Sequence, residues 1–213
     1  IDGVFTNNLS NAGEELAFIH AAGAPIQQFG YDDQAPWPIS ADGGGFSLVP
    51  TALNPTLDFN LPASWRASAQ VGGSPGADDP PVNIAAVLIN EVLTHTDTPV
   101  LDAIELFNPT ASAVDISGWY LRDDLRTPAK FKIPNGTSIP AGGYIVFDEN
   151  DFNPNPGVPP SFTLSSSGDE VYLYSATADG TLTGYSQGFQ FKGAANGVSF
   201  GRYTNSVGEI LYP

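Results

Sequence analysis

The stretch Val114-Asp115-Ile116-Ser117-Gly118-Trp119-Tyr120-Leu121 carries the strongest fold signal in this chain of 213 residues. Its centre, Asp-Ile-Ser-Gly, is typical of a tight turn, because short polar side chains bond to the nearby backbone and glycine adopts positive φ at little steric cost. Large apolar residues follow at once, so Trp119 is placed to fill a core between two sheets. The stretch therefore predicts a turn that leads into a buried strand.

Alternation with a period of two continues on both sides of this stretch. In residues 103–107, Ile104 and Leu106 alternate with Glu105, which predicts that the two apolar side chains face a core and the glutamate faces away. Similar short runs are separated by turn residues, and no long amphipathic helix is indicated. The expected strands are residues 15–19, 84–93, 103–107, 118–122, 143–147, 170–175 and 198–202. We therefore predict an all-β chain, with one helical turn opened by Pro62.

The charge balance narrows the classes of partner. The chain carries 7 Lys plus Arg against 23 Asp plus Glu, which gives a formal net charge of −16. Nucleic acid is not an expected partner, because so few positive charges cannot form a basic face. The chain has no cysteine, which excludes disulfides and Cys-ligated metal sites. No apolar run approaches the roughly 18 residues of a membrane span. The acidic composition favours an extracellular or cell-surface setting.

An internal repeat divides the chain. Residues 9–19 align without gaps on residues 164–174, and residues 45–48 align on residues 197–200. The first copy has no counterpart of residues 84–163. Between the copies, residues 72–81 are rich in Gly, Pro and Asp, so this segment is the best predicted boundary. The proline-rich residues 148–160 are interpreted as a loop inside one strand series.

Several segments, in order, resemble the lamin tail domain family of bacterial secreted proteins. They are residues 88–92, 102–108, 114–121 and 133–144 in the second copy, and residues 9–14, 31–38, 43–48, 65–68 and 73–76 in the first. The resemblance implies tandem immunoglobulin-like β-sandwiches. Residues 1–76 would form the rear half of one domain, residues 77–82 a linker, and residues 83–213 a nearly complete second domain.

The family motifs describe a folding framework and name no catalytic residue. The predicted structural core comprises Trp37, Trp65, Trp119, Ile104 and Leu106. Trp37 recurs in the family pattern, so we favour a core position for it over an exposed platform that stacks on sugars or peptides.

Two features that could suggest an enzyme are interpreted as structural. Residues 184–188 match the nucleophile pattern G-x-S-x-G, but no helix pattern follows, so we predict a turn between strands. His20 and His95, the two histidines of the chain, are predicted to be solvated loop residues. We therefore predict that the chain is not an enzyme and requires no cofactor.

Asp148, Glu149, Asp151 and Asn153 concentrate oxygen ligands in one short segment. Calcium takes six to eight oxygens, often from such loops, but the spacing departs from the EF-hand pattern. Two interpretations stay open: a structural calcium site, and a solvated acidic loop.

The functional prediction is a non-catalytic structural or adhesive module of a repeat-built bacterial surface or secreted protein. The chain begins at Ile1, and we expect it to be part of a longer protein. An incomplete first copy would expose sheet edges. Either it docks on the second copy, or a neighbouring chain supplies the missing strands, or the sequence is only the ordered part of a longer chain. Strands from a neighbouring chain would make a filament subunit that self-associates head to tail. The alternative is a targeting or spacer domain of a secreted hydrolase such as a nuclease or phosphatase. Contact with glycans is left open.

Overall fold

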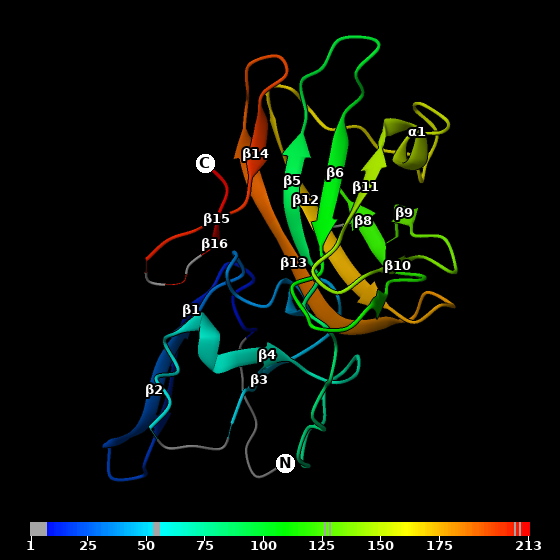
Figure 1. The fold of residues 1–213 in the computed structure, drawn as a ribbon. Helices are drawn as coiled ribbons and strands as arrows, with labels where there is room; N and C mark the ends of the chain where they lie inside the picture. Colours follow the sequence, from blue (N-terminus) through cyan, green and yellow to red (C-terminus); the bar gives the residue numbers. More distant parts are fainter. Residues whose placement is uncertain (1–7, 53–55, 126, 128, 207, 209) are drawn as a thin grey trace. The chain divides into compact units, whose positions relative to one another are not determined.

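The computed structural model describes residues 8–52, 56–125, 127, 129–206, 208 and 210–213. Their regular secondary structure is almost entirely antiparallel β-strand, which confirms the predicted all-β class (Figure 1). The chain divides into two compact units, Ile1–Val82 (unit 1) and Asn83–Pro213 (unit 2), and each is described by itself. No helix in the described part of the chain has the length and apolar character needed to cross a membrane.

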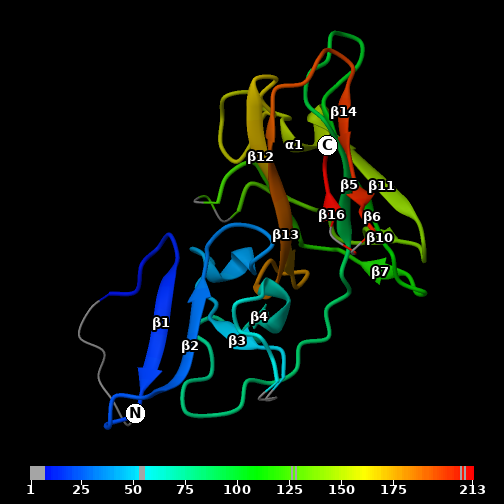
Figure 2. The ribbon, with the colours of Figure 1, turned by 90° about the vertical axis from the view of Figure 1, so that its left-hand side faces the viewer.

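Unit 2 contains two four-stranded antiparallel sheets around one core (Figure 2). The first sheet has the order β11-β6-β5-β14, formed by Tyr144–Asp148, Ala103–Phe107, Leu88–Leu93 and Ser199–Gly201. The second has the order β13-β12-β8-β9, formed by Leu182–Lys192, Gly168–Ala176, Tyr120–Arg122 and Phe131–Lys132. Two short pairs are β7 (Val114–Asp115) with β10 (Ser138–Ile139), and β15 (Tyr203–Thr204) with β16 (Ile210–Leu211). This is the two-layer arrangement of an immunoglobulin-like sandwich.

Strand alternation fills the core of unit 2 from both sheets. Ile104 and Leu106 of β6 are fully buried, and so is Leu121 of β8. Glu105, between the two buried residues of β6, accepts a hydrogen bond from Nδ2 of Asn90 at 2.6 Å. The glutamate therefore has a polar partner on the neighbouring strand β5, on the side of the sheet away from the core.

The turn before β8 fixes the position of the core tryptophan. The carboxylate of Asp115 accepts a hydrogen bond from the backbone N–H of Ser117 at 2.8 Å. Gly118 follows with a φ of +79°, and a Cβ there would overlap the carbonyl oxygen of Thr177. Only glycine meets both conditions. The chain then places Trp119 in the core, where 4% of its surface is exposed.

Residues near the end of unit 2 complete the sheet that contains β5, the first strand of this unit. β14 pairs antiparallel with β5, and the hydroxyl of Ser199 donates to Oε1 of Glu91 at 2.5 Å. Farther along, the ring of Tyr212 stacks on Phe189 with centroids 3.6 Å apart. Its hydroxyl donates to the carbonyl oxygen of Ile89 at 2.7 Å. Strand β5 is thus held by partners that follow it by more than a hundred positions.

The expected turn at residues 184–188 is wrong, because this segment lies inside the long strand β13. Gly188 stands opposite Tyr172 of β12, and a Cβ at Gly188 would overlap the ring of that tyrosine. The glycine therefore makes room for a side chain on the adjacent strand.

Most expected strands differ from the observed ones by one or two residues at an end, and two segments differ more. The strand predicted at residues 84–93 begins only at Leu88. The segment predicted as a loop at residues 148–160 opens with one turn of helix, α1 (Glu149–Phe152). A capping box stabilises this helix: the side chain of Asp148 accepts from a first-turn amide, and the side chain of Asp151 accepts from the N–H of Asp148.

Unit 1 contains two two-stranded antiparallel sheets among its described residues. β1 (Glu14–Ile19) pairs with β2 (Pro25–Tyr31), and β3 (Leu48–Pro50) pairs with β4 (Trp65–Ala67). Short 3₁₀ turns lie at Ile39–Ala41 and Pro62–Ser64. The second is the helical turn predicted from Pro62. The proline is the first residue of this turn, a position where a backbone N–H would have no partner within the helix.

The segment predicted as a boundary is bonded to unit 1 as far as Asp79. The carboxylate of Asp79 accepts hydrogen bonds from Nη1 of Arg66 at 2.5 Å, from the N–H of Ala69 at 2.9 Å and from the hydroxyl of Ser74 at 3.0 Å. Asp79 lies within the predicted linker 77–82, so this part of the segment is anchored on unit 1.

Candidate functional site

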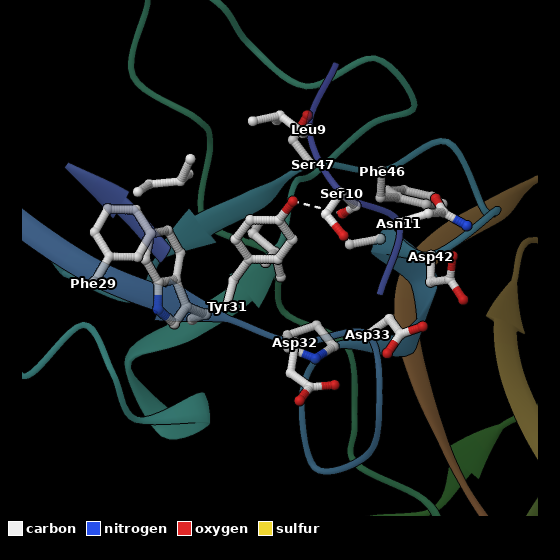
Figure 3. A pocket seen from close by; sticks show the side chains of 15 residues that line it. Leu9, Ser10, Asn11, Phe29, Tyr31, Asp32, Asp33, Asp42, Phe46 and Ser47 are labelled. Atoms are coloured by element: carbon white, nitrogen blue, oxygen red, sulfur yellow. Dashed lines mark hydrogen bonds between the residues drawn. The ribbon is translucent and has the colours of Figure 1, made fainter. Parts of the chain in front are cut away.

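A cavity of about 510 Å³ lies beside the β1–β2 hairpin of unit 1 (Figure 3). Its apolar wall is formed by Leu9, Leu16, Phe29, Phe46, Leu48 and Trp65. Leu16 and Phe29 are directly paired across the hairpin, so their side chains share one face of it. A cavity lined by large apolar side chains is suited to receive apolar side chains of a partner.

Four aromatic rings support one side of this cavity. The centroids of Phe29 and Phe59 lie 5.1 and 5.5 Å from that of Trp65, and Trp37 lies 6.4 Å away. Nε1 of Trp65 donates to the carbonyl oxygen of Phe59 at 2.8 Å. Trp37 is buried, whereas Trp65 is half-buried and lines the cavity. Trp65 therefore serves the wall of an open site as well as the interior of unit 1.

The turn that leads into β1 forms another part of the wall. The hydroxyl of Tyr31 donates to the carbonyl oxygen of Ser10 at 2.6 Å and lies 3.2 Å from Oε1 of Glu14 (Figure 3). Desolvation, and then the nearby Glu14 carboxylate, raise the pKa of Tyr31. Gly13 takes a φ of +85° here, and a Cβ would lie 2.5 Å from the carbonyl oxygen of Tyr31. The hairpin entry is thus closed by contacts that require glycine.

The polar part of the lining is acidic, because Asp32, Asp33 and Asp42 lie on it. Oδ1 of Asp32 accepts from the N–H of Gln34 at 2.9 Å, and this hydrogen bond lowers the pKa of Asp32. Asp33 accepts from the side-chain amide of the same glutamine at 3.0 Å. A partner that enters the cavity would therefore meet an apolar wall and a negatively charged border.

The four residues of the calcium prediction lie together around α1. Oδ1 of Asp148 accepts from the N–H of Asn150 at 2.8 Å, and Oε1 of Glu149 accepts from Nδ2 of Asn153 at 2.9 Å. Oδ2 of Asp151 accepts from the N–H of Asp148 at 3.1 Å. No group of three or more acidic or histidine side chains in the described residues is arranged to hold a metal ion. The carboxylates of Asp148 and Asp151 thus cap a helix, and calcium binding stays a prediction.

The histidines lie in different units. His20 is exposed, and its Nδ1 accepts from the N–H of Ala22 at 3.1 Å. His95 is half-buried, with Nδ1 2.8 Å from the carbonyl oxygen of Ala194, so it is less solvated than the sequence suggested. Ser186 of the G-x-S-x-G match lies in the middle of β13 rather than at a turn before a helix.

Trp37 and Trp65 are predicted core residues, but the cavity that Trp65 lines is not predicted from the sequence. The available signal was the alignment of the two copies. It places Leu9 and Leu16 in the positions of Leu164 and Val171, which lie in the core of unit 2. Core-type residues in a unit without the strands that should cover them indicate an open face.

A family model described as Lamin Tail Domain matches residues 80–188, just over half of the chain. The matched segment runs through unit 2 and stops inside β13. No curated protein and no solved structure matches the chain. The match does not reach the residues before 80, so the tandem copy stays a prediction.

Proposed function

Because the chain belongs to the lamin tail domain family, we propose that it is a protein-interaction module that performs no catalysis itself. The observation that carries this proposal is the uncovered apolar face of the β1–β2 hairpin. Leu9, which lines the cavity, is 57% exposed. Phe18 lies two positions after the cavity-lining Leu16, on the same face of β1, and is 66% exposed. An apolar surface of this kind favours binding of a protein partner.

We also propose an extracellular or cell-surface setting, in a structural or adhesive protein built from repeats. The net charge of −16 supports solubility there. In such a protein, strands from a neighbouring repeat would complete each unit that is left open. This strand complementation would join the modules head to tail.

The second candidate function is a targeting or spacer domain of a secreted hydrolase. The closed core of unit 2 favours it, because a sandwich with its own core needs no partner to fold. The reading frame of the natural gene separates the two functions. Further repeats of this kind support the structural module, whereas a nuclease or phosphatase domain supports the accessory role.

The proposed interaction can be tested with peptides selected from a random displayed library on the immobilised full chain. We expect Leu9→Asp to weaken binding of the selected peptides at least about tenfold, which is about 1.4 kcal/mol. Val71→Asp is the matched control, because Val71 is 61% exposed and does not line the cavity. Equal affinities for the Leu9 variant and the control would show that this face is not the binding site.

A further inference from the structure

We propose that β1 is an acceptor for an added strand, donated by the front half of another lamin-tail-type domain that lies outside residues 1–213. The strand would pair with Ala17–Ile19 in the register that β8 holds on β12. This inference rests on the proposed function and deepens it, because it names both the pairing edge and the chemistry of the occupant.

The β1–β2 hairpin of unit 1 and the β12–β13 hairpin of unit 2 begin with the same local structure. In each, a serine N–H donates to the acidic side chain four residues later: Ser10 to Oε1 of Glu14 at 2.7 Å, and Ser165 to Oδ2 of Asp169 at 2.9 Å. In each, the N–H two positions after the serine donates to the serine hydroxyl at 3.3 Å. In the alignment, β12 starts at Gly168, one position earlier than the counterpart of Glu14, where β1 starts. The edges of the two strands therefore correspond residue by residue, with Ala17–Ile19 in the positions of Tyr172–Tyr174.

The edges of the two strands are used differently. β12 pairs with β13 on one side and with β8 on the other, where Leu173 stands opposite Leu121. The alignment puts Phe18 of β1 in the position of Leu173. β1 pairs with β2, and in the described part of unit 1 no strand lies on its other edge. That edge presents backbone donors and acceptors to an incoming strand.

The face of β1 beside this edge carries apolar residues whose counterparts in unit 2 are buried in the core, but in unit 1 these residues are exposed. Leu173 and Leu164 of unit 2 are 0% and 5% exposed, whereas their counterparts Phe18 and Leu9 are 66% and 57% exposed. In unit 2, the front-half strands β6 and β8 supply the apolar side chains that pack against this face. The cavity of about 510 Å³ in unit 1 lies on the corresponding side of the β1–β2 hairpin. It is the space that such strands would fill.

A second copy of this chain is a poor donor of these strands. Its own β8 is already paired with β12 and β9, and Leu121 is fully buried there. Donating β8 would uncover on the donor the same apolar face that it covers on the acceptor, so the exchange has no net gain in burial. Each copy also carries a net charge of −16, and like charges repel. A front half with no rear half of its own is the occupant that gains from binding.

The occupant must present a specific pattern. In unit 2 the donor strand β8 reads Tyr120-Leu121-Arg122, and its central residue points into the core. An added strand therefore needs an apolar residue opposite Phe18, running antiparallel to β1. Further apolar residues must reach Leu16 and Phe29 on the cavity wall.

The test joins an additional copy of residues 83–163 to the start of the full chain, so that a free front half precedes unit 1. Amide hydrogen exchange is measured across Ala17–Ile19 by NMR. We expect exchange of the amides on the free edge to slow at least about 100-fold relative to the unmodified chain, with no change in β12. Two matched fusions, one with Leu121→Asp in the added copy alone and one with Phe18→Asp in β1, should exchange as fast as the unmodified chain.

Three results would overturn the inference. The first is equal exchange at Ala17–Ile19 in the fusion and the unmodified chain. The second is slow exchange there in the unmodified chain at all concentrations, since the edge would then be filled from within. The third is exchange in the unmodified chain that slows as its concentration rises, since a second copy would then be the occupant. If the fusion fails while the selected peptides still require Leu9, this inference falls and the proposed function stands.

Discussion

Gly118 shows how much of unit 2 depends on one residue. It combines a φ of +79° with a close approach to the carbonyl oxygen of Thr177, directly before the buried Trp119. Gly118→Ala must therefore move the backbone that positions the tryptophan. We expect this variant to lower the free energy of unfolding of unit 2 by about 3–4 kcal/mol, measured by urea denaturation. Gly136→Ala is the control: its φ is +86° and no atom lies near a Cβ, so only about 1–2 kcal/mol should be lost.

Asp79 gives unit 1 a predictable pH dependence. Burial alone would raise the pKa of its carboxyl, but the donors from Arg66, Ala69 and Ser74 outweigh burial and lower the pKa below its ordinary value of 3.8. Because the folded pKa is the lower one, the stabilisation is complete above about pH 5 and is lost as the pH falls through the folded value. We therefore measure the free energy of unfolding of unit 1 as a function of pH. In Asp79→Asn, we expect this free energy to fall less steeply at acid pH than in the unmodified chain. An unchanged pH dependence would show that other carboxyl groups dominate.

Variants of helix α1 test the two interpretations of the acidic segment, a calcium site and a solvated acidic loop. Asp148 caps the helix, so Asp148→Ala should destabilise unit 2 by about 1 kcal/mol in buffer that contains a chelator. The cap alone predicts the same loss with calcium present. Oδ1 of Asn153 is buried with no hydrogen-bond partner in the described residues, which leaves one oxygen for an ion. Heat in a calcium titration, abolished by Asp151→Asn, would support the calcium prediction; no heat would favour the cap.

The strands differ in how well the sequence predicts them, and the reasons are local. Ala103–Phe107 was predicted with its observed limits, because Ile104 and Leu106 stand on either side of Glu105 and so give the period of two. β2 was not predicted, since Gln27, Gln28 and Gly30 break the alternation on an exposed hairpin. Gly188 looked like a turn residue, but its role is to admit the ring of Tyr172 on the adjacent strand. That role depends on a pairing that no local pattern contains.

The fold of unit 2 could thus be predicted, whereas the cavity of unit 1 could not. The same apolar alternation occurs in Leu16 and Phe18 of β1 as in Val171 and Leu173 of β12. Exposure depends on whether other strands cover these residues, and alternation specifies only the face on which they lie. The sequence therefore predicts that these residues are apolar and share one face, but it does not predict that they line a cavity.

At the scale of the whole molecule, the two units should differ in local stability. Unit 2 closes a core between two four-stranded sheets, whereas the described part of unit 1 has two-stranded sheets and an open apolar face. Small sheets with few buried residues open more readily. We expect amides of β1 and β2 to exchange faster than those of β12 and β13 in the unmodified chain. Equal protection in both hairpins would contradict this difference.

The pairing of β5 with β14 has a consequence for how unit 2 folds. Glu91 and Ser199 are 108 positions apart, and Ile89 and Tyr212 are 123 positions apart. Bringing such distant positions together costs chain entropy before any contact rewards it, so folding of this unit should be slow for its size. During synthesis, β5 leaves the ribosome first among the strands of unit 2, and one of its edges stays unpaired until almost the whole unit has been synthesised. In this interval the unpaired edge can pair with a wrong strand, so a chaperone that shields strand edges would help most at this stage.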